Sequence, residues 1–574
     1  MKKIILTSAM ILSAVSIAMS SNRHTDVNIK IIATTDVHGS FFPYDFIEGR
    51  PLKGSLARIA SYVTRARAQQ PDGVVLLDNG DILQGQPVNY YYNFLSADSE
   101  NIAAQCLNFM RYDAYTCGNH DIEPGAPCYT KFFRALKCPV LGANIIDTIT
   151  DKPYLCPYTI VERQGIRIAI IGLITPAIPH WLMPEKWTGL RFDDMMSTAR
   201  QWVSHVKMYE QPDIVVGLFH SGRSGGISQP DCRENMCEEI ARSVPGFDII
   251  LYGHDHRPVC ETIQSDGGHN VLMVNAGNAA RQVAEVTIFS APDGTLQKKA
   301  RLVDICNEQP DSAYMQHFQT QINEVQQWAQ RKIGTIDTTI TTRDCFFGPS
   351  AFTDLIHNLQ LHITGADISI AAPLTFNATL HKGDITVADM FKLYKYENTL
   401  CVVSMRGREI RQHLEMSYAQ WAATMTSPHD HLMLLNDERS SHERAVFKHM
   451  YFDFDSAAGI DYIVDVRQPA GSRIKIQQMT DGTPFDEEKT YRVAMNSYRA
   501  NGGGQLLTQG AGIPKAELPK RILWQSELDQ RYYLMKEIER RQHIAPQPNS
   551  NWHFHPKQWT DAAALRDRKI IFGE

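Results

Sequence analysis

The first half of the sequence contains short, uninterrupted apolar runs, each of which ends abruptly in polar residues. The runs are rich in valine, isoleucine and leucine and show no regular alternation with polar residues. Such strands are typically buried on both faces of a sheet covered by helices. Helix-like segments, such as Ser55–Gln69 and Met195–Tyr209, lie between them, which predicts a layered α/β domain. The runs are Val27–Thr35, Val74–Leu77, Ile168–Ile174, Asp213–Phe219, Asp248–Tyr252 and Val271–Val274.

The length and charge of the chain limit what it can do. With 574 residues, it is too long for one domain, and 43% apolar with 21% charged residues is the composition of a soluble globular protein. The net charge of −6 argues against binding of duplex nucleic acid, because neutralising phosphates requires clustered lysine and arginine. Small nucleotides remain possible ligands.

The N-terminus has the pattern of a secretion signal. Lys2 and Lys3 precede an apolar run, Ile4–Met19, and the small-residue pattern Ala18-Met19-Ser20 follows. This predicts a signal peptide, residues 1–20, and hence a periplasmic or secreted protein whose net charge becomes −8. The alternative is an uncleaved anchor, although the run is short for about 30 Å of hydrocarbon. No later stretch is apolar for long enough to cross a bilayer, so no transmembrane segment is expected after cleavage.

A segment that favours one long helix separates the first half from a second half with a different pattern of helices and strands. Residues 311–333 contain no glycine or proline and many glutamines, and Gly334 could cap the end of a helix there. We therefore expect a connecting helix, 311–334, between a first domain, 26–310, and a mixed α+β second domain, 335–530. Residues 531–574 are expected to form a C-terminal tail, in which His553 and His555 would be solvated.

Carboxylates, imidazoles and an amide follow four of the apolar runs of the first half and a further short run, Tyr112–Thr116. In open α/β sheets, ligands gather at the carboxyl ends of the strands, so these residues can converge although they span 220 positions. The motifs are Thr35-Asp36-Val37-His38-Gly39, Asn79-Gly80-Asp81, Gly118-Asn119-His120-Asp121, His220-Ser221-Gly222 and Gly253-His254-Asp255-His256.

This set of side chains suits two divalent cations. Aspartate and histidine without thiolate fit Zn, Mn or Fe better than Ca or Mg, which prefer oxygen ligands alone. A carboxylate can bridge two cations about 3.5–4 Å apart, and such a pair can clamp the oxygens of an in-line phosphoryl displacement. Binding to such cations can lower the pKa of a water molecule to about 7, so a hydroxide nucleophile is available at neutral pH. The sequence therefore predicts metal-assisted hydrolysis of phosphoesters.

Together, these motifs resemble the signature of the calcineurin-like metallophosphoesterases. With the leader, the connecting helix and the segment Asn496–Gly504, the chain resembles the secreted bacterial 5'-nucleotidase family. Its closest resemblance there is to the periplasmic 2',3'-cyclic-nucleotide 2'-phosphodiesterase/3'-nucleotidases, through Leu393–Cys401, Gly459–Tyr462 and Tyr498–Ala500. The resemblance implies a four-layer αββα metallophosphoesterase sandwich, joined by a long helix to an α+β nucleotide-binding domain.

The resemblance also implies roles for individual residues. Two divalent cations, Zn, Mn, Co or Fe, would be shared between the sets Asp36, His38, Asp81 and His256, and Asp81, Asn119, His220 and His254, with Asp81 bridging. 5'-Nucleotidases of the family often carry glutamine where this chain has His256. His120 would be the catalytic histidine, oriented by an acidic residue for which Asp121 and Glu123 are both candidates. Tyr396 and Tyr498 would stack on the nucleobase, and Asn119 would also contact the substrate.

The resulting hypothesis is an exported dinuclear-metal hydrolase. It would open 2',3'-cyclic nucleotides to 3'-nucleotides and then release nucleosides and phosphate. The nearest alternative is a 5'-nucleotidase or UDP-sugar hydrolase on the same scaffold. Thiosulfohydrolase action and a nucleotide-binding module without catalysis are more distant alternatives; the aromatic pair argues against the first, and the intact ligand set against the second.

Overall fold

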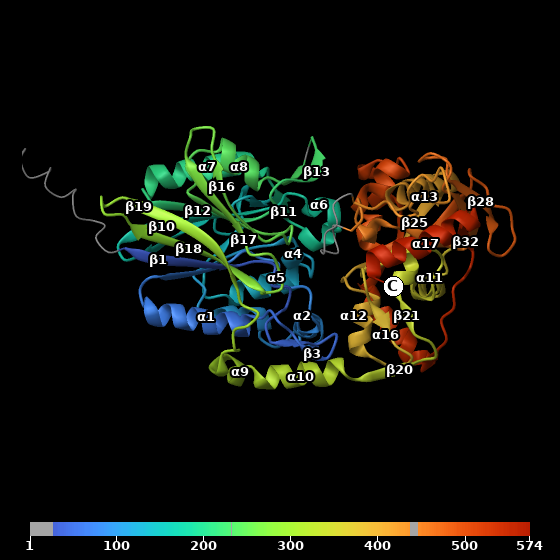
Figure 1. Ribbon diagram of the computed structural model, residues 1–574, viewed down its shortest axis with the longest axis horizontal. Coiled ribbons are helices and arrows are strands. Elements are labelled where there is room, and N and C mark those ends of the chain that lie inside the picture. The colour runs from blue at the N-terminus through green and yellow to red at the C-terminus, as the bar shows by residue number, and fades with distance from the viewer. Residues whose placement is uncertain (1–26, 231, 437–445, 574) are drawn as a thin grey trace, which may run out of the picture.

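The computed structural model describes residues 27–230, 232–436 and 446–573, and in it the chain forms two lobes. Figure 1 shows them side by side, the first coloured blue to green and the second mainly yellow to red. The predicted signal peptide lies outside the described residues. Within the ranges described, no helix is both long and apolar enough to cross a membrane.

The first lobe is built on two six-stranded sheets. Four neighbouring strands are parallel in each sheet: β1, β4, β5 and β6 in one, and β10, β12, β15 and β17 in the other. The first sheet has the order β19 (Leu296–Asp304), β18 (Gln282–Ser290), β1 (Asn28–Thr34), β4 (Val74–Asp78), β5 (Ala114–Thr116), β6 (Val140–Leu141). The second has the order β16 (Val259–Gln264), β17 (Asn270–Asn275), β15 (Ile249–Tyr252), β12 (Ile214–His220), β10 (Ile166–Ile174), β9 (Tyr158–Arg163).

Adjacent residues of the central strands face different layers. Ile31 of β1 and Ile170 of β10 belong to the core between the two sheets, whereas Ile32 and Ile171 pack against helices on the outer faces. Burial of both faces explains why these strands appear in the sequence as continuous apolar runs. The first lobe is therefore a four-layer αββα sandwich, which confirms the predicted fold class.

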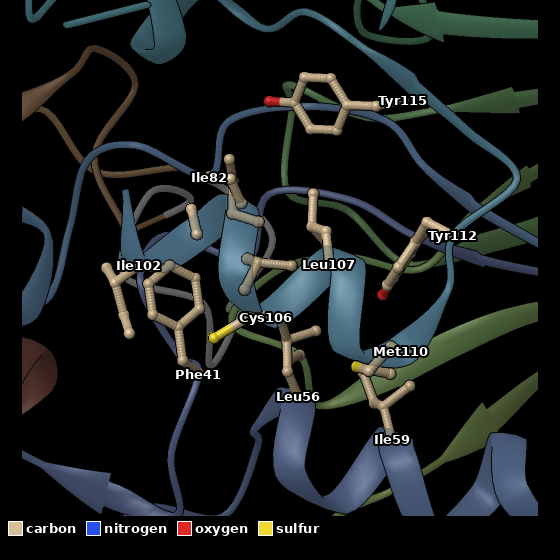
Figure 2. Packing of buried hydrophobic residues seen from close by; sticks show 14 of the residues in the cluster. Phe41, Leu56, Ile59, Ile82, Ile102, Cys106, Leu107, Met110, Tyr112 and Tyr115 are labelled. Atoms are coloured by element: carbon tan, nitrogen blue, oxygen red, sulfur yellow. The ribbon is translucent and has the colours of Figure 1, made fainter. Parts of the chain in front are cut away.

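Helices α1 (Leu56–Gln69) and α3 (Ile102–Met110) cover the outer face of the first sheet. Leu56 and Ile59 of α1 pack near Leu107 and Met110 of α3, as Figure 2 shows. Helix α1 begins after Ser55, whose hydroxyl accepts a hydrogen bond from the Arg58 N–H and so satisfies a donor of the first turn. On the second sheet, α7 (Met195–Tyr209) and α8 (Cys237–Ser243) provide the equivalent layer.

The predicted single connecting helix is wrong, because the segment contains two helices and a strand. Helix α9 (Ser312–His317) and helix α10 (Gln319–Ala329) are separated at Phe318, which leaves helical geometry at φ −100° and ψ 10° and is fully buried in the first-lobe core. Strand β20 (Lys332–Ile336) follows and pairs with β24 (Gly383–Thr386). Gly334 consequently lies inside a strand rather than at a helix end.

The second lobe is a mixed α+β assembly, as predicted. Its largest sheet has the order β26 (Ser456–Ala458), β22 (Ile368–Ala371), β29 (Thr490–Asn496), β25 (Thr399–Arg406), β30 (Ile522–Asp529). Helices α11 (Ala351–Thr364), α12 (Val387–Leu393) and α13 (Gly407–Trp421) bury residues in the two hydrophobic cores of this lobe.

The expectation of a separate tail after residue 530 is also wrong. Strand β31 (His543–Ile544) pairs with β20, and β32 (Trp552–His555) pairs in parallel with β27 (Ile460–Asp465). Trp552 and Phe554 are buried in the core of the second lobe, so hydrophobic burial holds this segment in place. Helices α16 (Gln530–Arg541) and α17 (Lys557–Phe572) complete it, and His553 stays exposed on the opposite face of β32.

Candidate metal centre

The loops that follow β1, β4, β5, β12 and β15 bring the predicted ligands together at one edge of the two sheets. Five of the seven predicted metal ligands, Asp36, His38, Asp81, His254 and His256, have a positive φ between 47° and 72°. A non-glycine residue in this left-handed region costs about 1–3 kcal/mol and persists only where the surrounding structure enforces it. Such strain often occurs at functional sites, which makes this edge the candidate site.

Glycines allow these loops to approach each other closely. A Cβ on Gly118 would lie 2.3 Å from Oδ1 of Asp81, and one on Gly253 would lie 2.0 Å from Oγ1 of Thr35. Any larger side chain would push the loops apart, so the glycines beside the polar motifs are a steric requirement of the site.

One group of candidate ligands consists of Asp36, His38 and His256. Nε2 of His256 lies 3.2 Å from Oδ1 of Asp36 and 3.1 Å from Nε2 of His38. Burial, with the nearby charge of His256, lowers the pKa of His38 to about 3. His38 is therefore neutral at pH 7 and has a ring nitrogen lone pair for a cation.

A second group consists of Asp81, His220 and His254, with Asn119 beside it. Nε2 of His220 lies 3.2 Å from Oδ2 of Asp81 and 3.1 Å from Oδ1 of Asn119. The other ring nitrogen of His220 is 2.6 Å from the backbone carbonyl of Asn79, which fixes the orientation of the ring.

Asp81 lies between the two groups. Its Oδ2 is 3.2 Å from Nε2 of His220 and 3.9 Å from Nε2 of His38, which belongs to the first group. Burial would raise the pKa of Asp81, but the charges of His220 and His120 hold it well below its ordinary range. The carboxylate is thus ionised and can serve as a bridging ligand. The donors are carboxylate, imidazole and amide, a set that fits divalent transition-metal ions.

His120 lies beside this centre and is held from two sides. Its backbone N–H donates to Oδ1 of Asp81 at 2.7 Å, and its ring Nδ1 lies 2.5 Å from Oε2 of Glu123. Burial alone would lower the pKa of His120, but Asp81 and Glu123 raise it to about 9.

The two acidic residues after His120 have different surroundings. The carboxylate of Asp121 accepts hydrogen bonds from the backbone N–H groups of Asp81, Ile82, Leu83 and Gly118 and from the Tyr115 hydroxyl. It therefore ties together the loops after β4 and β5. Of these two acidic residues, Glu123 is the one that contacts the His120 ring.

Glu234 is a site residue that the sequence did not reveal. Its Oε1 lies 2.9 Å from Nε2 of His254, while its Oε2 accepts a hydrogen bond from the Ile227 N–H at 2.7 Å. It lies in β14 (Cys232–Asn235), which forms a hairpin with β13 (Gly225–Gln229). No apolar run comes directly before Glu234 in the sequence. The pattern that identified the other side chains therefore could not find it.

Tyr396 and Tyr498 lie near the same end of the second-lobe sheet. Tyr396 precedes β25, Tyr498 lies in α14 (Ser497–Ala500) directly after β29, and Leu400 is paired with Asn496. Both tyrosines are half-buried. A Cβ on Gly503 would lie 2.5 Å from the ring of Tyr498, so only glycine lets the chain pass so close to it.

The two lobes meet around these residues. Burial raises the pKa of Tyr498 well above its ordinary value, and the charges of Asp453, Tyr396 and Glu234 of the first lobe add to the shift. The Asn501 side chain donates to the carbonyls of Pro179 and Leu182 at 3.1 and 2.9 Å. Between Pro179 and Leu182, the ring of Trp181 lies 5.4 Å from that of His254, so Asn501, three residues after Tyr498, contacts the first lobe beside the candidate metal centre.

Comparison with known proteins gives independent information on both lobes. Residues 29–258 match the calcineurin-like phosphoesterase family, and residues 332–509 match the 5'-nucleotidase C-terminal domain. A 2',3'-cyclic-nucleotide 2'-phosphodiesterase/3'-nucleotidase from Yersinia enterocolitica is 25% identical, with 95% of this chain and 91% of that protein covered.

Two further relatives define the extent of the similarity. A trifunctional nucleotide phosphoesterase from Bacillus subtilis is 25% identical over 97% of this chain, and the chain spans only 41% of that protein's length. A solved Staphylococcus aureus structure, in complex with α-ketoglutarate, has a TM-score of 0.77 at 24% identity, with 92% of this chain and 99% of that chain covered. The two-lobed fold is therefore shared over nearly the whole described chain.

Proposed function

The chain belongs to the calcineurin-like metallophosphoesterases that carry a 5'-nucleotidase C-terminal domain, and we propose that it is an exported 2',3'-cyclic-nucleotide 2'-phosphodiesterase and 3'-nucleotidase. Membership makes it a phosphoric ester hydrolase that depends on divalent metal ions. The observation that carries the proposal is the position of Asp81 between two histidine-containing groups, at a site beside which Asn501 of the second lobe contacts the first lobe.

In this proposal, Asp36, His38, Asp81 and His256 hold one cation, and Asp81, Asn119, His220 and His254 hold the other. Zn, Mn, Co and Fe suit these ligands. When bound, the two cations would supply a water nucleophile at neutral pH and offset the negative charge of the phosphoryl group. Their combined charge of +4 would also attract an anionic nucleotide to a protein of negative net charge.

His120 acts on the leaving group or on the developing charge. The contact of its Nδ1 with Glu123 leaves Nε2 available for the substrate. From there the ring can protonate the leaving oxygen or stabilise the charge that develops on it. In the first reaction, water attacks phosphorus and the bond to O2' breaks, giving the 3'-nucleotide. In the second, the bond to O3' breaks, giving nucleoside and phosphate.

Tyr396 and Tyr498 would hold the nucleobase, and Asn119 would contact the phosphate. Stacking on an aromatic face contributes about 1–3 kcal/mol per base and tolerates any base, because every base has a π face. We therefore propose broad base specificity. The signal peptide predicted for residues 1–20 would export the protein to the periplasm or beyond.

A side-by-side assay of 2',3'-cyclic AMP, 3'-AMP and 5'-AMP, with Mn or Zn added, tests the choice of substrate. We expect hydrolysis of the first two and release of adenosine. The alternative, a 5'-nucleotidase or UDP-sugar hydrolase, is favoured by the 5'-nucleotidase domain at residues 332–509. Activity confined to 5'-AMP would reject our proposal in favour of that alternative.

A further inference from the structure

Arg531 lies outside both family matches, yet its side chain is buried against the loop that carries Tyr396. It is 3% exposed and belongs to α16. Its Nε donates to the carbonyl of Tyr394 at 2.8 Å, and its Nη2 donates to the carbonyl of Lys395 at 2.6 Å. Its Nη1 donates to Oε1 of Glu397 at 3.0 Å. One guanidinium thus contacts the residues on both sides of Tyr396.

Backbone bonds hold the loop around Tyr396 at its two ends: the Tyr394 N–H donates to the Met390 carbonyl, and the Asn398 carbonyl accepts from the Gln530 N–H. The loop lies between the end of α12 at Leu393 and the start of β25 at Thr399, and residues 394–398 belong to neither element. Without helix or sheet bonds, its backbone carbonyls need other donors. The planar guanidinium offers donors in a fixed fork, which can hold several acceptors in one geometry.

Arg531 also lies where the two lobes meet. Its guanidinium carbon is 3.9 Å from the ring centre of Phe391 and 5.1 Å from that of Tyr90, which comes from the first lobe. The Tyr90 hydroxyl donates to Oδ2 of Asp529 at 2.7 Å. Tyr90 ends α2 (Pro87–Tyr90), a few residues after the loop that holds Asp81. The loop with Tyr396 is thus anchored against the lobe that carries the metal centre.

We propose that Arg531 is a positioning residue for nucleobase binding, which fixes the loop 394–397 so that the Tyr396 ring stands ready to stack on the base. This inference rests on the proposed stacking role of Tyr396. Arg531 does not touch the substrate; it acts through the backbone of Tyr394 and Lys395 and the carboxylate of Glu397. Loss of the Arg531 guanidinium should therefore lower kcat/KM for substrates that contain a nucleobase. Metal binding and the hydrolysis of substrates without a base should not change.

The test compares 3'-AMP with glycerol 2-phosphate, a phosphomonoester that has no aromatic ring. For Arg531→Lys, which keeps a positive charge beside Glu397 but loses the fork, we expect kcat/KM for 3'-AMP to fall by about five- to 150-fold, the equivalent of losing one stacked base. Metal content and kcat/KM for glycerol 2-phosphate should change less than twofold. Arg531→Gln should show the same selective loss.

Arg540→Gln is the matched control, because Arg540 lies on the same helix, has a side chain that is 62% exposed and forms an ion pair with Glu537, away from the loop 394–397. It should behave as wild type on both substrates. Wild-type kcat/KM for 3'-AMP in Arg531→Lys would overturn the inference. The inference would also be overturned if both Arg531 variants lost metal and lost kcat/KM equally for 3'-AMP and glycerol 2-phosphate. Arg531 would then be needed for folding in general.

Tyr396→Ala, measured in parallel, separates this inference from the proposed function. If Tyr396→Ala lowers kcat/KM for 3'-AMP and Arg531→Lys does not, only the role of Arg531 is wrong. If Tyr396→Ala has no effect on 3'-AMP, the stacking role itself is wrong and the inference falls with it.

Discussion

Nδ1 of His120 lies 2.5 Å from Oε2 of Glu123, three residues farther along the chain. This contact fixes the orientation of the ring, while the backbone N–H of His120 is bound to Asp81. Replacing Glu123 by glutamine keeps the size of the side chain and removes its charge. A hydrogen bond to a charged group contributes about 1.5–3 kcal/mol, so we expect kcat to fall by about 10- to 150-fold in Glu123→Gln. Steady-state kinetics with 3'-AMP, at unchanged metal content, provide the measurement.

Asp121→Asn should have a different effect. The carboxylate of Asp121 accepts four backbone N–H bonds that join the loops after β4 and β5, and it does not contact the ring of His120. We expect the free energy of unfolding, measured by urea denaturation, to fall by about 1.5–3 kcal/mol. Metal binding should also become weaker. If Asp121→Asn instead lost turnover at normal stability, and Glu123→Gln kept it, the two assignments would have to be exchanged.

His120→Asn should separate catalysis from metal binding. The His120 ring contacts Glu123 and is not among the grouped candidate ligands. We therefore expect both metals to be retained and turnover to fall by roughly 10²–10⁴, the range for a general acid or base. Metal analysis and kcat on 3'-AMP are the two readouts. Full turnover on every phosphoester tried would show that His120 is not catalytic.

Tyr498 should contribute through its ring rather than its hydroxyl. Removal of one stacking face should raise KM for 3'-AMP by about five- to 150-fold in Tyr498→Ala, the equivalent of about 1–3 kcal/mol. Tyr498→Phe keeps the ring and is the matched control, so its KM should stay within about twofold of wild type. An equal increase in both variants would mean that the hydroxyl, not stacking, binds the substrate.

His357 should make the second lobe sensitive to acid. The residue is fully buried between Ser369 and Ser456, and burial lowers its pKa to about 3 from 6.5. Between those values the unfolded chain binds a proton that the folded chain does not, so the stability from neutral His357 is lost as pH falls below 6.5. From pH 7 to pH 5 the loss should be about 2 kcal/mol.

Urea unfolding of wild type and His357→Gln at both pH values isolates this contribution. The glutamine variant cannot take up the proton, so it should lose about 2 kcal/mol less than wild type on acidification. Equal losses in the two proteins would show that His357 does not contribute to the acid sensitivity.

The sequence could indicate which side chains gather at this edge because they follow buried strands, and six of them form the two groups in the structure; that these groups bind metal stays a prediction. Asp36, His220 and His254 each lie at the end of an apolar run or within two residues of it, and such continuous runs are typical of strands buried on both faces. Glu234 belongs to a short hairpin with no such run, so nothing local marked it. The choice between Asp121 and Glu123 depends on the direction of side chains after the turn at Gly118, which a linear pattern does not contain.

The errors in the fold have a similar origin. Propensity predicts one helix over residues 311–334, but burial of Phe318 in the first-lobe core breaks that helix, and pairing with β24 draws Lys332–Ile336 into a strand. The last 44 residues appeared as a tail because their strand, β32, is short and pairs with β27, ninety residues earlier. Long-range pairing of this kind overrides local preference.

The central claim is that Asp81 joins two metal sites that together hydrolyse nucleotides. Its most direct test is elemental analysis of the purified wild type and of Asp81→Ala after loading with Mn or Zn, with 3'-AMP hydrolysis measured on the same samples. We expect two ions per wild-type chain, loss of both from Asp81→Ala and loss of hydrolysis with them. Retention of two ions and of 3'-AMP hydrolysis by Asp81→Ala would contradict it.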